Sequence, residues 1–91
     1  MDDLFEWDPK KAVMNRKKHG VSFPDATPVF SDPNALTIDL QDADGEERHV
    51  TLGMDDVGRI LTVVHTYRGP RTRIISARKA TSHERRQYEG R

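Results

Sequence analysis

The sequence predicts a small α+β protein in which the helices stay apart from an antiparallel sheet. Three observations lead to this prediction. Two helix starts, at Asp8-Pro9 and at Ser22, come early in the chain. Four β-rich runs separated by turn residues fill the middle, and Thr81 and Glu84 stand at capping-box spacing before a last helix. The 91 residues suffice for one domain, residues 1–91, with a modest core.

The first helix follows a short extended segment, Leu4 to Trp7, that can act as a strand. Asp8 can cap the helix, Pro9 suits its first position, and Gly20 ends it. Polar side chains lie on the side where an apolar stripe is expected, namely Asn15, Arg16 and His19. Either these residues form a site or the helix packs loosely.

A second helix is expected from Ser22 through Phe30, ended by the turn residues Asp32, Pro33 and Asn34. The strands that follow are residues 35–40, 47–54, 59–67 and 73–78. Asp44-Gly45 predicts a hairpin between the first two. The third run is the longest and most β-branched, so we place it centrally.

The last strand carries apolar residues on both faces, which indicates a place inside the sheet. Strict alternation would put Arg73, Ile75 and Ala77 on one face, and Ile74, Ser76 and Arg78 on the other. The helix that starts at Thr81 follows directly. We expect the helices on one face of the sheet and a second face that is partly open.

Composition excludes several classes of protein. Because the chain has no cysteine, disulfides and thiolate metal sites are ruled out. No apolar run approaches the ~20 residues of a membrane span, and the start lacks a signal peptide's basic residues, so we expect a cytoplasmic protein without a membrane partner. The net charge is zero, but basic ends flank an acidic middle. Those ends could form one basic face for a polyanion, or they could be solvated faces and internal ion pairs.

Several short motifs stand in a fixed order along nearly the whole chain: Phe5-Glu6-Trp7-Asp8, Lys18-His19-Gly20-Val21-Ser22-Phe23, Asp32-Pro33, Glu47-Arg48, Gly58-Arg59 and Arg73-Ile74-Ile75-Ser76-Ala77-Arg78. In this order and spacing they resemble the BrnT toxins. The resemblance implies a RelE-like fold and a type II toxin–antitoxin toxin that cleaves RNA and inhibits translation. It also implies a BrnA-type antitoxin with a ribbon-helix-helix DNA-binding end. We expect a heterotetramer that represses its own operon and contacts operator DNA only through the antitoxin.

RNA cleavage without a metal needs a base for the 2′-hydroxyl, a cation for the phosphorane and an acid for the 5′-oxygen. The sequence has no H-x-H or H-E-x-x-H motif, so we expect neither a metal nor a cofactor. The predicted catalytic residues are His19, Lys18, Glu47, Arg48, Arg68 and Arg78. His19 is the first choice for acid or base. Its alternative role is a helix-terminal histidine packed on Trp7.

Arg78 and Arg68 are the best phosphate clamps, and structural ion pairs are their alternative. Glu47 and Arg48 are neighbours on a strand, so only one of them can point at the open face. Lys11, Arg73, Arg85 and Tyr88 are expected to bind RNA, Tyr88 by stacking on a base or, alternatively, by packing only. Core packing is expected for His65 and Tyr67, and a surface position for His49. The alternative function is a non-catalytic module that binds RNA or the antitoxin.

Overall fold

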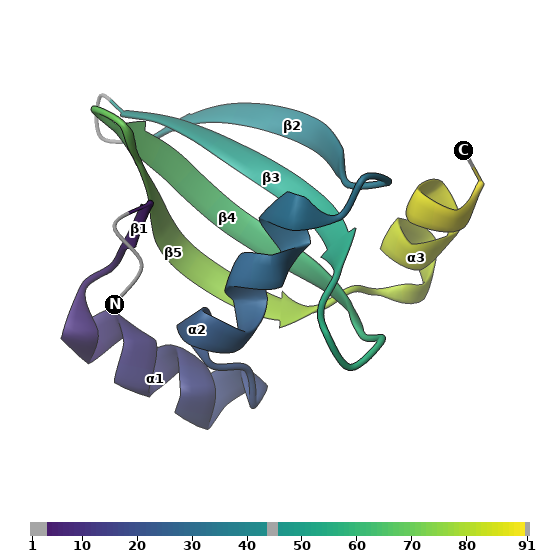
Figure 1. The fold of residues 1–91 in the computed structure, drawn as a ribbon, viewed down its shortest axis with the longest axis horizontal. Helices are drawn as coiled ribbons and strands as arrows, with labels where there is room; N and C mark the ends of the chain where they lie inside the picture. The colour runs from purple at the N-terminus through teal and green to yellow at the C-terminus, as the bar shows by residue number, and fades with distance from the viewer. Residues whose placement is uncertain (1–3, 44–45, 91) are drawn as a thin grey trace.

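The computed structural model describes residues 4–43 and 46–90, which are built around a five-stranded sheet (Figure 1). The strands are β1 (Phe5–Glu6), β2 (Leu36–Ala43), β3 (Glu46–Met54), β4 (Ile60–Arg68) and β5 (Arg71–Lys79). The helices are α1 (Pro9–His19), α2 (Phe23–Ala26) and α3 (Ser82–Glu89), and a 3-10 helix, η1 (Thr27–Ser31), follows α2. The predicted α+β fold is confirmed.

The strands lie in the order β1-β5-β4-β3-β2. Strands β2 to β5 therefore form the predicted antiparallel meander, and β1 pairs in parallel with β5 as a short edge strand. The antiparallel pairing of β2 with β3 reaches Ala43 and Glu46. The hairpin turn predicted at Asp44-Gly45 lies outside the described residues.

Helix α1 begins and ends where its capping residues predict. The side chain of Asp8 accepts a hydrogen bond from the amide of Lys10 at 2.8 Å, and Pro9 occupies the first turn. Gly20 adopts a left-handed conformation with φ of 71°, which few other residues tolerate. Its amide donates to the carbonyl of Arg16 and closes the last turn.

The expected second helix is divided into α2 and η1. Ser22 caps α2 as predicted and accepts a hydrogen bond from the amide of Asp25 at 3.2 Å. Pro28 has no amide hydrogen, so the α-helical bond back to Pro24 cannot form. The hydroxyl of Thr27 donates to the carbonyl of Pro24 instead, at 2.9 Å, and the chain continues as a 3-10 helix.

The hydrophobic core lies between the sheet and the segment that contains α1, α2 and η1 (Figure 1). Its buried members are Val21, Phe23, Ala26, Val29, Leu61, Val63, Ile74 and Ala77. Helix α3 stands apart from α1 and α2, contacts β3, and has no buried residue. We call the sheet face that packs on α1 and α2 the core face, and the opposite one the outer face.

A bulge in β5 interrupts the alternation of side chains between the two faces that was expected for this strand. Val64 pairs with Ser76, whereas the next residue, His65, pairs with Ile74, so Ile75 is an extra residue. Ile74 and Ala77 therefore both reach the core. The prediction from strict alternation was wrong, because the bulge places Arg73 and Arg78 on the same face, the outer one.

Candidate functional site

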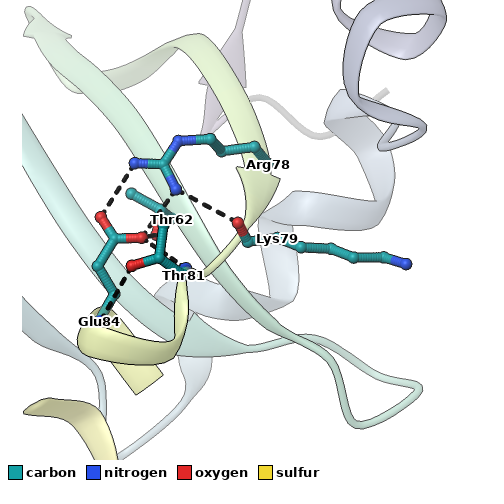
Figure 2. A network of polar contacts seen from close by, with 5 residues as sticks. All are labelled: Thr62, Arg78, Lys79, Thr81 and Glu84. Atoms are coloured by element: carbon teal, nitrogen blue, oxygen red, sulfur yellow. Dashed lines mark hydrogen bonds and ion pairs between the residues drawn. The ribbon is translucent and has the colours of Figure 1, made fainter. Parts of the chain in front are cut away.

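Arg78 forms a two-pronged ion pair with Glu84 on the outer face (Figure 2). Nη1 of Arg78 lies 2.7 Å from Oε1 of Glu84, and Nη2 lies 3.0 Å from Oε2. Nη1 also donates to the carbonyl of Lys79 at 3.3 Å. Arg78 thus has the ion pair that we considered as an alternative to phosphate binding, although its partner comes from α3 and not from the acidic middle.

The local sequence explains why Glu84 reaches Arg78. Strand β5 ends at Lys79, and Thr81 caps α3 after a short link. The predicted capping box is present: the amide of Glu84 donates to Oγ1 of Thr81 at 3.2 Å, and Oε1 of Glu84 accepts from the amide of Thr81 at 2.8 Å. Oε1 also accepts a hydrogen bond from the hydroxyl of Thr62 on β4, at 3.0 Å. One carboxylate therefore joins α3 to β4 and β5.

The ion pair fixes the charges of both side chains. The hydrogen bond from Arg78 lowers the pKa of Glu84 to about 2, with smaller contributions from the Thr81 amide and the Thr62 hydroxyl. The hydrogen bond to Glu84 raises the pKa of Arg78. Glu84 is therefore ionised at neutral pH and is a poor proton acceptor, whereas it is well suited to orient a cation.

Other arginines share the outer face with Arg78. Arg48 is half-buried, and its Nε has no hydrogen-bond partner among the described residues. Arg68 pairs with Glu46 at 2.9 Å, and Arg73 pairs with Glu6 at 2.7 Å. Arg71, which the sequence analysis left out, lies directly across from Arg68 in the sheet. The result is a stripe of arginines, here called the arginine face: Arg48, Arg68, Arg71, Arg73 and Arg78.

The arginine face is long, so its members cannot all hold one phosphate. Arg78 lies across from Thr62 and Arg73 across from Thr66, while Arg68 ends the same strand. At roughly 3.3 Å per residue, Thr62 and Arg68 are about 20 Å apart along β4. The two predicted clamps, Arg78 and Arg68, therefore stand at opposite ends of the face. This spacing suits several phosphates of one strand better than a single one.

The structure does not bring the predicted residues of α1 onto the arginine face. Helix α1 packs on the core face, where Asn15 bonds to Ala77 of β5. His19 is half-buried at the end of this helix, and Lys18 and Lys11 are exposed. Asn15, in contrast, is a buried structural residue, so this part of the polar stripe does not form a site.

Glu47 points away from Arg48 and lines a small cavity of about 220 Å³ with Glu46, His49, Thr66 and Tyr67.

The ring of His49 stacks on that of His65 with 5.6 Å between the ring centroids, and its centroid lies 5.0 Å from that of Tyr67. Tyr67 is 59% exposed, so its predicted core position was wrong, while His65 is buried as predicted. Burial, together with the nearby charge of His49, lowers the pKa of His65 to about 4, so His65 is neutral at pH 7.

The predicted RNA-binding residues of α3 have different surroundings. Arg85 is exposed and lies 3.9 Å from Glu89. The hydroxyl of Tyr88 donates to Oδ2 of Asp32 at 2.6 Å, and the amide of Met54 donates to the same oxygen. Tyr88 therefore fastens the end of α3 to the body of the protein.

Over residues 4–43 and 46–90, the side chains of His, Asp and Glu form no group of three or more that could hold a metal ion. In the same part of the chain, none of the helices has both the length and the apolar character that a bilayer span requires.

Comparison with known proteins identifies the family. A family model described as the ribonuclease toxin BrnT of type II toxin–antitoxin systems matches residues 7–84. No curated protein matches the chain. The crystal structure of the Brucella abortus ribonuclease toxin BrnT superposes with a TM-score of 0.69 at 28% identity, over 86% of this chain and 96% of that one. The family model ends at Glu84, so it includes the Arg78–Glu84 pair and leaves out Arg85 and Tyr88. The chain belongs to the BrnT family of ribonuclease toxins from type II toxin–antitoxin systems.

Proposed function

We propose that the protein is a metal-independent endoribonuclease that cleaves RNA and thereby inhibits translation. The arginine face is the observation that supports this most directly. Guanidinium groups bind phosphate through paired N–H donors and stay charged at any working pH. A row of guanidinium groups along a rigid sheet can bind successive phosphates of an RNA backbone. The family to which the chain belongs consists of ribonucleases, which makes cleavage of the bound RNA the expected reaction.

In the proposed reaction, the 2′-oxygen of the RNA attacks the adjacent phosphorus, and the bond from phosphorus to the 5′-oxygen breaks. A base accepts the proton of the 2′-hydroxyl, and an acid delivers a proton to the departing 5′-oxygen. Arg78 stabilises the charge of the phosphorane, while Arg48 and Arg68, further along the face, bind other phosphates of the same RNA strand. His19, Lys18 and Lys11 lie on α1 against the core face and Glu47 points away from Arg48, so we assign none of them to the phosphate that Arg78 binds. We assign RNA binding outside the cleaved bond to Arg73, Arg85 and Tyr88.

The proposal extends to the partners of the protein. Membership in the family implies an antitoxin. We propose that it is of the BrnA type, that it carries a ribbon-helix-helix DNA-binding end, and that two copies of each chain form a cytoplasmic heterotetramer. This complex would bind operator DNA through the antitoxin and repress its own operon. Size measurement and operator binding of the co-purified pair test this part.

The central test compares the wild type with Arg78→Ala for RNA cleavage by purified protein, with and without a chelator, and for growth after induced expression. We expect the wild type to cut RNA in the chelator and to arrest growth. Arg78→Ala should fold but cut RNA on the order of a hundredfold more slowly, because it loses a charged donor to the transition state. Arg86→Ala is the control, since Arg86 is an exposed arginine on α3 without a proposed role. Cleavage that stops in the chelator would contradict the metal-independent mechanism.

The alternative is a non-catalytic module that binds RNA or the antitoxin. It is favoured by one observation, the carboxylate partners of Arg68, Arg73 and Arg78, because such pairs also serve structural roles. The two functions differ in turnover. An enzyme cuts many RNA molecules per protein molecule, whereas a binding module leaves RNA intact at every concentration.

A further inference from the structure

The ion pair uses only part of the hydrogen-bonding capacity of Arg78 (Figure 2). A guanidinium has five N–H donors in a fixed planar arrangement. Glu84 accepts one hydrogen from Nη1 and one from Nη2, and the carbonyl of Lys79 accepts the second hydrogen of Nη1. Within the described residues, neither Nε nor the second hydrogen of Nη2 forms a hydrogen bond. These two N–H groups lie along one edge of the guanidinium.

The side chain of Arg78 is partly exposed, and its unused edge has the geometry that phosphate requires. The side chain of Arg78 is 38% exposed, whereas that of Glu84 is only 15% exposed. Parallel N–H groups on one edge of a guanidinium bind two oxygens of a phosphate at once. Glu84 therefore holds Arg78 through its Nη1–Nη2 edge and leaves the adjacent Nε–Nη2 edge for a ligand.

Glu84 is itself held from several sides. Its carboxylate accepts hydrogen bonds from the amide of Thr81 and from the hydroxyl of Thr62, besides those from Arg78. Thr62 is 2% exposed in the central strand β4. A carboxylate fixed in this way limits how far the long arginine side chain can move, which lowers the entropy that binding must overcome.

We infer that Glu84 is a positioning residue, which orients Arg78 so that its Nε–Nη2 edge binds the phosphodiester of the RNA substrate. The inference depends on the proposed function for the identity of the phosphate. Glu84 does not itself touch the substrate, and it moves no proton. The opposite role, in which Glu84 masks Arg78 until RNA displaces it, predicts faster cleavage when the ion pair is removed.

Glu84→Gln is the variant that separates these roles. Glutamine can still accept the Thr81 amide and so preserves the capping box, but its NH₂ group cannot accept a hydrogen bond from Arg78. We expect kcat for RNA cleavage to fall on the order of tenfold to a hundredfold, as for a misplaced catalytic group, with a smaller change in KM. A rate equal to or above that of the wild type would overturn the inference.

Two controls account for effects on α3 alone. Glu89→Gln removes the same charge from the same helix, at a residue whose described ion pair is a 3.9 Å contact with Arg85. Thr81→Ala removes the capping hydroxyl but leaves the backbone amide that bonds to Glu84. Both should cleave RNA at the rate of the wild type. If either loses as much activity as Glu84→Gln, then helix stability and not the orientation of Arg78 explains the loss, and the inference fails.

A second measurement does not depend on cleavage. The Nε–H resonance of Arg78, assigned by its loss in Arg78→Lys, should shift when the wild type is titrated with a 2′-O-methyl RNA, which lacks the attacking hydroxyl. The same shift in Glu84→Gln should need on the order of tenfold more RNA. If this resonance does not respond to RNA, the inference is wrong even where the wild type cuts RNA. If it responds in a wild type that cuts nothing, the ribonuclease proposal fails and the orientation of Arg78 toward phosphate stands.

Discussion

A single buried amide joins α1 to the sheet. Nδ2 of Asn15 donates to the carbonyls of Val21 and Ala77 at 2.9 and 2.8 Å, and its Oδ1 accepts from the amide of Ala77 at 3.1 Å. Asn15 is only 6% exposed, so water cannot replace these bonds. The polar stripe of α1 thus contains a structural residue, and its hydrogen bonds compensate for the weak apolar character of this helix.

Asn15→Ala should lower the free energy of unfolding by on the order of 2–4 kcal/mol, because it leaves buried backbone groups without partners. Urea unfolding followed by circular dichroism measures the loss. The neighbouring change Met14→Ala is the control, since Met14 is 68% exposed and should shift the stability by less than about 0.5 kcal/mol. Equal stability of the two variants would contradict the role given to Asn15.

Among the elements, β3 and η1 approach each other so closely that only glycine fits between them. A Cβ atom placed on Gly53 would lie 2.6 Å from Cγ1 of Val29 and 3.1 Å from its carbonyl oxygen. This contact packs η1 closely against the sheet and positions Asp32. The carboxylate of Asp32 accepts hydrogen bonds from the amide of Met54 and from the hydroxyl of Tyr88. The packing of η1 is thereby linked to the anchoring of α3.

Gly53→Ala should destabilise the protein by about 1–3 kcal/mol through overpacking. Val29→Ala alone should also destabilise it, since it removes a buried side chain. The double variant should be more stable than the sum of the two losses predicts, because the shorter side chain removes the closest of the contacts. Additive losses in thermal unfolding would show that the two residues do not interact.

The sequence predicts elements well where the signal is local. Asp8, Pro9 and Gly20 delimit α1, and Thr81 with Glu84 starts α3, because capping depends on residues a few positions apart. The bulge at Ile75 was not predictable, because it arises from pairing with β4. The same limit applies to the candidate site: the ion pair of Arg78 and the stack of His49 on His65 depend on strand register, which alternation alone does not supply.

For the molecule as a whole, His65 and Glu84 connect stability to pH most strongly, and they lie on opposite faces of the sheet. The pKa of Asp55 is lowered as well, so Asp55 acts in the same direction as Glu84. His65 is buried on the core face beside Phe30, with its Nε2 2.8 Å from the hydroxyl of Thr51. Burial lowers its pKa from 6.5 to about 4. Glu84 lies on the outer face, where the hydrogen bond from Arg78 lowers its pKa from 4.5 to about 2. In both cases the unfolded chain binds protons at a higher pH than the folded protein does.

Stability should therefore fall in two steps as the solution is acidified. Between pH 6.5 and about 4 the unfolded state gains a proton at His65 that the folded state resists, and between pH 4.5 and about 2 the same holds for Glu84. The contribution of Glu84 is about 1–2 kcal/mol after allowance for solvent screening at the half-exposed Arg78. The measurement is the slope of the unfolding free energy against pH.

Two variants assign these steps to their residues. His65→Phe should flatten the slope above pH 4, and Glu84→Gln should flatten it below pH 4.5, even where either change lowers the overall stability. His83→Gln is the matched control, because His83 is an exposed histidine on α3 and should leave both slopes unchanged. A wild-type slope of zero across both ranges would mean that neither group differs in pKa between the folded and unfolded states. Unchanged slopes in His65→Phe would contradict the assignment of the upper step to His65.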